Sequence, residues 1–236
     1  WENDKKEDEA GRLKVGGNVR YRHSSTDQLS TTNSESFLTS GANSSFSNRM
    51  NRSKSGNTNV NSNFRLEWSP DTMTRIMFRP NFSFSQNYSD GQSSSVTFND
   101  NPYTRGMTDP LSQYRDYVSD SIVVNDNRRW SHSDGQSYSV DGMLMVNRRL
   151  NSKGRNLTLR MRGGYSDSDN KSFNISDVNY FLQRKPGGGY DRSYMHQYNV
   201  NPSKSYNGSA DLSYSEPLFA GAHLQFSYRY QYRYSD

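Results

Sequence analysis

The sequence contains no cysteine and little apolar material. None of its 236 residues is Cys, only 30% are hydrophobic, and the mean hydropathy is -1.10. The absence of cysteine excludes a disulfide scaffold and leaves the redox compartment open. No stretch approaches the roughly 18–20 consecutive apolar residues that a membrane helix needs, so helical insertion is excluded.

The net charge is modest and the basic residues are not clustered. The net charge is +5, and the arginines occur mostly at alternate positions rather than in one patch. Because phosphate recognition requires clustered basic side chains, the pattern argues against nucleic acid as a partner. Residues 1–10 are too highly charged for a signal peptide. We therefore expect either a mature exported form or a piece of a longer protein.

What the sequence does contain is long alternation of apolar and polar residues. At the C-terminal end, Ala222, Leu224 and Phe226 alternate with polar residues, and Tyr228, Tyr230 and Tyr232 continue the pattern. Successive residues of a strand point to opposite faces, so one face is apolar and the other hydrophilic. Strands in soluble sheets are usually about 5–6 residues long, whereas a tilted bilayer crossing takes about 9–11. The length favours a transmembrane β-barrel.

The same alternation predicts seven strands. The ranges are Gly11–His23, Asn59–Trp68, Thr74–Gln86, Gln136–Leu150, Asn156–Asp167, Tyr206–Ser215 and Ala222–Tyr234. The expected fold class is all-β: an antiparallel transmembrane β-barrel segment with short periplasmic turns and long extracellular loops.

The two faces of these strands predict two sets of residues. Arginines on the polar face are expected to line a wet lumen, where they could bind the acidic side of a plug or steer an anionic solute. The simpler interpretation, which we prefer, is a wet wall balanced by Glu67, Asp141 and Asp211. The lumen-facing candidates are Arg12, Arg20, Arg22, Arg65, Arg75, Arg79, Arg160 and Arg162. The expected aromatic girdle at the membrane–water interfaces is Tyr21, Trp68, Tyr138, Tyr165, Tyr206, Tyr230 and Tyr232.

The connections between these strands alternate in length. The short ones contain Pro, Asp, Asn and Gly, which tight turns require, and we expect them on the periplasmic side. The long ones are expected as external loops. The short turns are Ser69–Met73, Asn151–Arg155 and Glu216–Gly221, and the long loops are Ser24–Thr58, Asn87–Gly135 and Ser168–Ser205.

Seven strands cannot close a bacterial single-chain barrel, whose strand number is normally even. Trp1 followed by a polar turn repeats the pattern of Trp68 and Ser69, as if an earlier strand ended at Trp1. We therefore expect residues 1–236 to be part of one outer-membrane β-barrel domain that other strands complete.

One stretch carries a family resemblance. Residues Asn59–Phe98, and above all Leu66–Pro80 (LEWSPDTMTRIMFRP), resemble the outer-membrane β-barrel proteins of Bacteroidota that are similar to TonB-dependent receptors. Ser95–Phe98 followed by Asp100, Asn101 and Pro102 fits as well. The resemblance implies a barrel in the bacterial outer membrane, preceded by a plug domain and an N-terminal periplasmic domain. Neither domain matches anything in this chain.

Catalysis finds no support in the sequence. The four histidines, His23, His132, His196 and His223, are expected at a strand end, in loops and beside a turn, without metal-ligand spacing. We expect no enzyme activity and no cofactor. Two further hypotheses are calcium binding by turns or loops and O-glycosylation. The candidate segments are Ser89–Gly91, Ser133–Gly135 and Asp167–Asn170 for calcium, and Asp71–Met73 and Asp120–Ile122 for glycosylation.

The functional hypothesis is a TonB-dependent receptor-like barrel that binds or imports a ligand across the outer membrane. The alternative is a non-transporting barrel that acts as a structural or assembly partner of other outer-membrane proteins. A soluble secreted β-protein is a third hypothesis. The expected partners are membrane lipid, a plug domain or further barrel strands, and a surface lipoprotein or another outer-membrane protein. Neither the ligand nor TonB coupling follows from the sequence.

Overall fold

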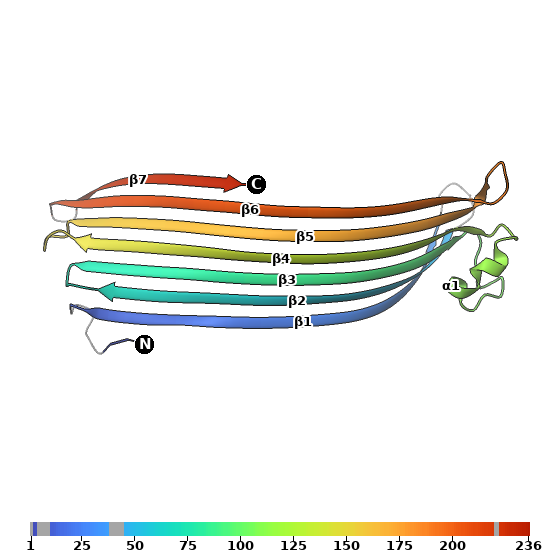
Figure 1. Ribbon diagram of the computed structural model, residues 1–236, viewed down its shortest axis with the longest axis horizontal. Helices are drawn as coiled ribbons and strands as arrows, with labels where there is room; N and C mark the ends of the chain where they lie inside the picture. The colour runs from blue at the N-terminus through green and yellow to red at the C-terminus, as the bar shows by residue number, and fades with distance from the viewer. Residues whose placement is uncertain (1, 4–9, 38–44, 220–221) are drawn as a thin grey trace.

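The chain forms one long antiparallel sheet. The computed structural model describes residues 2–3, 10–37, 45–219 and 222–236. Seven strands lie side by side in sequence order, so every neighbour in the sheet is also a neighbour in the chain (Figure 1). The strands are β1 (Arg12–Ser36), β2 (Ser45–Ser69), β3 (Thr74–Phe98), β4 (Val123–Arg149), β5 (Asn156–Arg184), β6 (Tyr190–Phe219) and β7 (Ala222–Ser235).

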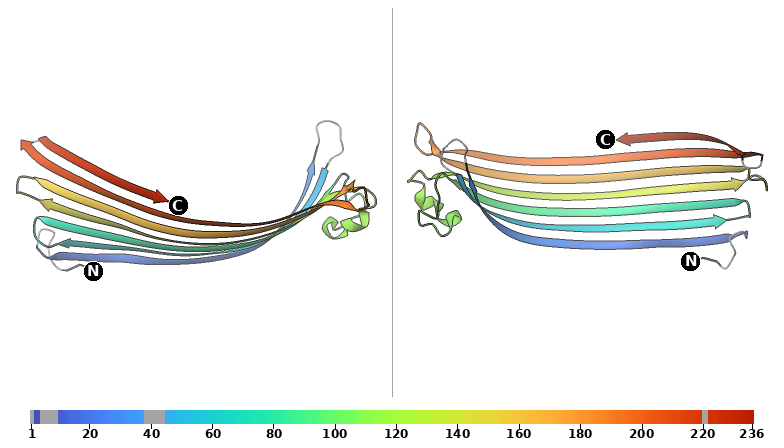
Figure 2. Two further views of the ribbon diagram at one scale, coloured as in Figure 1. Left: turned by 45° about the horizontal axis from the view of Figure 1, so that its top comes forward. Right: turned by 180° about the vertical axis from the view of Figure 1, so that it is seen from behind.

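The sheet is open, with β1 and β7 at opposite edges (Figure 1). Figure 2 shows that it is bent along the length of its strands and twisted, as L-amino-acid strands require. At the edge of β1, Glu2 forms an isolated antiparallel bridge with Lys14, and the Asn3 N–H donates to the Leu13 carbonyl at 3.1 Å. Trp1, on which the expectation of an earlier strand depended, lies outside the described residues.

The all-β antiparallel prediction is confirmed, but the strands are much longer than expected. Six of them run for 25 to 30 residues. The segments expected as long loops, Ser24–Thr58, Asn87–Gly135 and Ser168–Ser205, are mostly strand instead. The pairing of β1 with β2 continues from Arg12 and Ser69 to Ser36 and Ser45 without a shift. These segments are mostly polar on both faces, so alternation does not reveal them, although each pairs with at least one neighbouring strand.

The predictions for the calcium candidates and for two histidines are also wrong, because the segments expected as loops are strand. The calcium candidates Ser89–Gly91, Ser133–Gly135 and Asp167–Asn170 were expected in turns but lie inside β3, β4 and β5. His132 and His196 lie in strands rather than loops. Among the described residues, no group of three or more His, Asp or Glu side chains is placed to hold a metal ion.

The connections expected to be short do lie together at one end, but at the other end residues 185–189 form a turn as short as these between β5 and β6. The turns after β2 and β4 are at the end where β1 begins, and β6 ends and β7 begins at that end too (Figure 1). At the other end, residues 99–122 connect β3 to β4 and contain α1 (Pro110–Gln113) and a 3₁₀ turn, η1 (Tyr114–Tyr117). We call residues 99–122 the lobe. Across the described residues, no helix is long and apolar enough to cross a membrane.

Candidate functional site

Cross-strand pairing assigns every side chain to one of two faces, because directly paired residues point the same way. One row runs through all seven strands as Val15, Leu66, Phe78, Leu144, Met161, Ala210 and Tyr230. A second row, two residues nearer the short turns, is Leu13, Trp68, Ile76, Val146, Leu159, Leu212 and Tyr228. The predicted apolar sets therefore fall on a single surface, which we call the apolar face.

The apolar face is limited to the half of the sheet that bears the short turns. In β1 it extends from Leu13 to Tyr21, and in β5 from Leu157 to Tyr165, which is nine residues or about 27 Å along a strand. Many of its side chains remain exposed, including Phe78 at 43% and Phe226 at 60%. A large exposed apolar surface of this kind indicates contact with lipid or with another protein.

A row of tyrosines ends the apolar face. The ring centroids of Tyr138 and Tyr165 are 5.7 Å apart, those of Tyr165 and Tyr206 4.8 Å, and those of Tyr206 and Tyr234 6.3 Å. The hydroxyls of Tyr138 and Tyr165 both donate to the Asp167 carboxylate, at 3.1 and 2.9 Å. The first carboxylate of β5 thus lies directly beyond the rings, and the surface changes there from apolar to polar.

The other proposed girdle residues lie in different places. Tyr21 pairs with Val60 at the same level on β1, whereas Trp68 is at the opposite end, paired with Leu13. Tyr230 and Tyr232 lie within the apolar face of β7, below the level of Tyr234.

The opposite surface, which we call the polar face, carries the arginines. All eight lumen candidates lie on it, as their pairing partners show. Glu67 accepts hydrogen bonds from Arg65 and, at 3.3 Å, from Arg75. Asp211 pairs with Arg229 and, at 3.8 Å, with Arg162. The balance that we expected for Glu67 and Asp211 is therefore present.

The carboxylates of the polar face do not balance all of its arginines. In the part of the chain that the structure describes, no carboxylate lies within ion-pair distance of Arg20, Arg22 or Arg79, and all three side chains are exposed. Asp141, the third expected counter-charge, forms no ion pair among the described residues. The polar face of this half keeps a surplus of positive charge.

The polar face also has a hollow at the short-turn end, where Arg12 and Lys14 both pair with Glu2. The hollow encloses about 370 Å³ and is lined by Arg12, Lys14, Glu67, Arg75 and Arg149 among others. Asp71 is also on the rim, in the β2–β3 turn. The backbone N–H of Met73, at 2.7 Å, is the main reason that the pKa of Asp71 is lowered, so this carboxylate stays charged. We call this hollow the basic hollow, and it suits a carboxylate, a phosphate or an acidic peptide segment.

Beyond the tyrosine row the polar face is mostly uncharged, although Arg49 and Arg129 lie on it farther along β2 and β4. One row there reads Ser24, Asn57, Asn87, Gly135, Asn170 and Asn201, and the next reads Thr26, Ser55, Ser89, Ser133, Ser172 and Asn199. The sequence analysis missed this surface because it assigned these segments to loops. Alternate Ser, Asn and Gly from Ser85 to Ser95 were the available signal.

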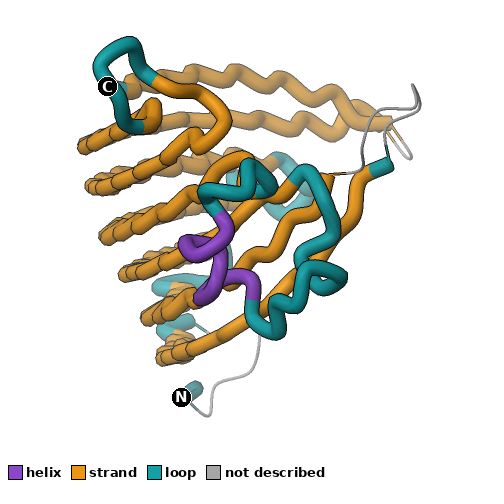
Figure 3. The backbone as a smooth tube through the Cα atoms, turned by 90° about the vertical axis from the view of Figure 1, so that its right-hand side faces the viewer, coloured by secondary structure: helices purple, strands orange, loops and turns teal. Residues whose placement is uncertain are grey.

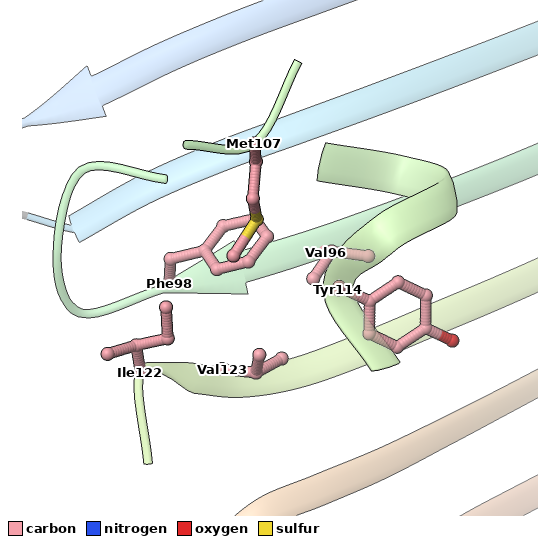
Figure 4. Close-up of a cluster of buried hydrophobic side chains, with 6 residues drawn as sticks. All are labelled: Val96, Phe98, Met107, Tyr114, Ile122 and Val123. Carbon is pink, nitrogen blue, oxygen red and sulfur yellow. The ribbon is translucent and has the colours of Figure 1, made fainter. Parts of the chain in front are cut away.

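The lobe packs on the far end of β2–β5, on the side of the sheet that carries the apolar face. Val96, Phe98 and Val123 of the sheet are completely buried or nearly so beneath it, and Met107, Tyr114 and Ile122 pack on them (Figure 4). Figure 3, which looks from this end, shows the helical turns beside the strand ends. The buried Asp126 carboxylate accepts hydrogen bonds from Tyr114 and, at 2.7 Å, from Asn179. These contacts fix the lobe to the sheet.

Comparison with known proteins adds little to this geometry. No protein-family model matches the chain, and no curated protein matches it. Among solved structures, a cryo-EM structure of the membrane pore complex of pneumolysin is similar over 84% of this chain at 8% identity and a TM-score of 0.18. The chain spans about a third (32%) of the length of that protein. A likeness this weak carries no argument about function.

Proposed function

We propose that this chain forms part of the wall of an outer-membrane β-barrel, similar to TonB-dependent receptors, that binds or imports a ligand. The observation that carries the proposal is the separation of the two faces over nine residues in every strand. Strands that cross a bilayer at a tilt take about 9–11 residues and alternate apolar-out with polar-in. Buried in lipid, the arginines would be very costly, whereas they cost little facing a wet lumen.

Two further features support a barrel. Short turns lie at one end and the lobe at the other, as in barrels with periplasmic turns and larger external segments. The bridge between Glu2 and Lys14 starts a pairing on the free edge of β1, which an additional strand would extend. Unpaired edges are unfavourable in a membrane, so further strands are expected to close the sheet.

Within such a barrel the polar face would line the path of the ligand. Its outer part offers neutral hydroxyl and amide groups, and its inner part offers unpaired guanidinium groups and the basic hollow. An anionic solute, or an acidic segment of a plug, would find most of the complementary charge after it passes the tyrosine row. The resemblance of Leu66–Pro80 supports the receptor-like assignment.

The second candidate function is a non-transporting barrel that serves as a partner of other outer-membrane proteins. The observation that favours it is the position of the lobe, which is fixed on the outward side of the sheet and not across the polar face. A rigid outward projection suits protein docking better than ligand capture.

Neighbouring residues on opposite faces allow a direct test. The chain has no cysteine, so Phe78→Cys and Arg79→Cys can be introduced one at a time into the full-length protein, with any other cysteines removed. In outer-membrane vesicles, a charged, water-soluble maleimide is expected to label Arg79→Cys and to leave Phe78→Cys unlabelled. After denaturation both should react.

Equal labelling of the two positions in intact vesicles would show that the apolar face is not in lipid, and the proposal would be wrong. To separate transport from scaffolding, uptake of candidate anionic solutes would be compared between the parent and an Arg20→Gln/Arg22→Gln variant. A scaffold predicts no difference, whereas an arginine-lined path predicts slower uptake.

A further inference from the structure

A second hollow lies beyond the tyrosine row, on the side of the sheet that carries the apolar face. It encloses about 530 Å³ and is lined by residues of β2–β6, including Arg52, Gln92, Arg128, Trp130 and Tyr194. Trp130 is eight residues beyond Tyr138 on the same face of β4, which is about 27 Å along the strand. We call this feature the outer hollow. It is separated from the polar face by the thickness of the sheet.

Aromatic rings form one side of the outer hollow. Trp130 and Phe173 meet edge to face with centroids 5.0 Å apart, and Phe173 meets His196 in the same way at 4.6 Å. His132 stacks beside Trp130 at 6.3 Å. The contacts hold the indole in place, and a fixed aromatic ring loses little conformational entropy when a ligand packs on it.

Arginines also line the outer hollow. Its one acidic lining residue, Asp177, is held by both Nε and Nη2 of Arg192, at 2.6 and 2.8 Å, and this pairing lowers the pKa of Asp177. Arg52 has only an exposed, 3.4 Å contact with Asp27. Arg128 contacts the Tyr114 hydroxyl of the lobe at 3.4 Å. Two guanidinium groups therefore remain available to a ligand.

We propose that the outer hollow binds an anionic oligosaccharide. A fixed indole packs against the C–H face of a sugar ring, Gln92 can bond hydroxyls, and guanidinium forks bind carboxylate or phosphate substituents in a bidentate manner. Its volume lies within the range of about 300–1,000 Å³ that small-molecule sites occupy.

The location selects this class of ligand. The inference rests on the proposed function in one respect: if the apolar face is in lipid, the outer hollow faces away from the lumen, outside the membrane and about 27 Å along the strand from the tyrosine row. The outer leaflet of a bacterial outer membrane carries anionic glycans at that level, so the wall is surrounded by such chains. An acidic protein segment is the competing occupant, but it has no need of a fixed aromatic platform beside a neutral amide.

The test is binding of a defined probe to the full-length protein in mild detergent. The probe is the anionic polysaccharide released without its lipid from the outer membrane of the same cells, and neutral dextran is the comparison. Titration calorimetry would compare the parent with Arg52→Gln/Arg128→Gln and with Trp130→Leu. Lys54→Gln is the matched control, because it removes one positive charge from the same face of β2 outside the outer hollow.

We expect the parent to bind the anionic polysaccharide and not dextran, and to bind more weakly as salt is raised. The double arginine variant should lose roughly tenfold or more in affinity, because it removes the charge-assisted hydrogen bonds to the anionic groups. Trp130→Leu should weaken binding at low and high salt alike. Lys54→Gln should bind as the parent does. Heat-modifiable gel mobility would verify that each variant is folded.

Three results would overturn the inference: no binding by the folded parent, equal binding of dextran, or unchanged affinity in the double variant. Capture of an acidic protein that the polysaccharide does not displace would also overturn it. The cysteine-labelling experiment keeps the two proposals apart. If Arg79→Cys is labelled and Phe78→Cys is not, but the polysaccharide does not bind, only the proposed glycan site is wrong. If the polysaccharide binds but the two positions are labelled equally, only the proposed membrane location is wrong.

Discussion

Phe64→Arg is the most direct energetic test of the apolar face. Phe64 lies at the middle level of the nine-residue apolar band, and its side chain is 49% exposed to the space that lipid would fill. An arginine at the midplane of a membrane barrel costs about 2–4 kcal/mol, and near the interfaces about 0–1 kcal/mol. We therefore expect Phe64→Arg to reduce the folding equilibrium constant by roughly 30-fold to 1,000-fold, since 1.4 kcal/mol is a factor of ten.

The neighbouring position supplies the control. Asn63 lies on the polar face, and Asn63→Arg adds the same charge to the same strand. We expect its cost to be close to zero. Trp68→Arg, at the short-turn end of the apolar face, should cost about 0–1 kcal/mol because it lies near an interface.

The assay is reversible unfolding of the full-length protein in lipid vesicles with guanidinium chloride, followed by heat-modifiable gel mobility. The slope and the midpoint together give the free energy of unfolding. The reasoning is refuted if Phe64→Arg and Asn63→Arg are equally destabilising, or if Phe64→Arg costs no more than Trp68→Arg. Either result would mean that the apolar face does not cross the bilayer.

Three other predictions concern local structure. A Cβ on Gly17 would lie 2.5 Å from Cδ1 of Phe64, while none of the described atoms lies within 4 Å of a Cβ on Gly16. Gly17→Ala should therefore lower the denaturant midpoint of unfolding, and Gly16→Ala should not. Equal effects of the two variants would contradict this packing. The lowered pKa of Asp71 means that its contribution is present at neutral pH and is lost as the pH falls through that lowered value. The stability difference between the parent and Asp71→Ala should therefore disappear in acid, and a constant difference would contradict this. Tyr114→Phe removes a hydrogen bond to a buried carboxylate, so amide hydrogen exchange in the lobe should accelerate while exchange in β1 stays unchanged.

The sequence predicts the two faces well because period-two alternation is a local property. The apolar sets around Val15, Phe78 and Met161 were assigned strand by strand, and the structure brings them into one row. The hydrophobic pattern excludes a slip of one residue, which would turn each set to the other face, and the short turns set the remaining register.

The far half of the strands was not predictable in this way. From Gln86 to Ser95 the residues are polar on both faces, so no alternation marks them as strand. Their extended conformation depends on pairing with β2 and β4, a tertiary effect that no single segment encodes. Sequence reasoning therefore placed Trp130 and Phe173 in loops, where their contact could not be foreseen.

The two hollows differ in how far they could be foreseen. Arg12 and Arg75 of the basic hollow were identified as candidates from alternation, whereas Arg149 was not. The pairing of Glu67 with Arg65 and Arg75 became apparent only in the structure. The outer hollow combines residues of five strands that are up to about 140 positions apart in sequence. Only the register across the sheet brings Arg52 and Tyr194 to one place.

The sequential order of the strands also determines how such a sheet can be assembled. Each strand pairs only with the one before and the one after it, and no connection crosses another. The sheet can therefore grow by one hairpin at a time, because each new strand needs only the edge that its predecessor has just formed. Growth by hairpins also allows the wall to be widened or narrowed at either edge without altering the pairs already made, so the size of such a wall can vary independently of its internal register.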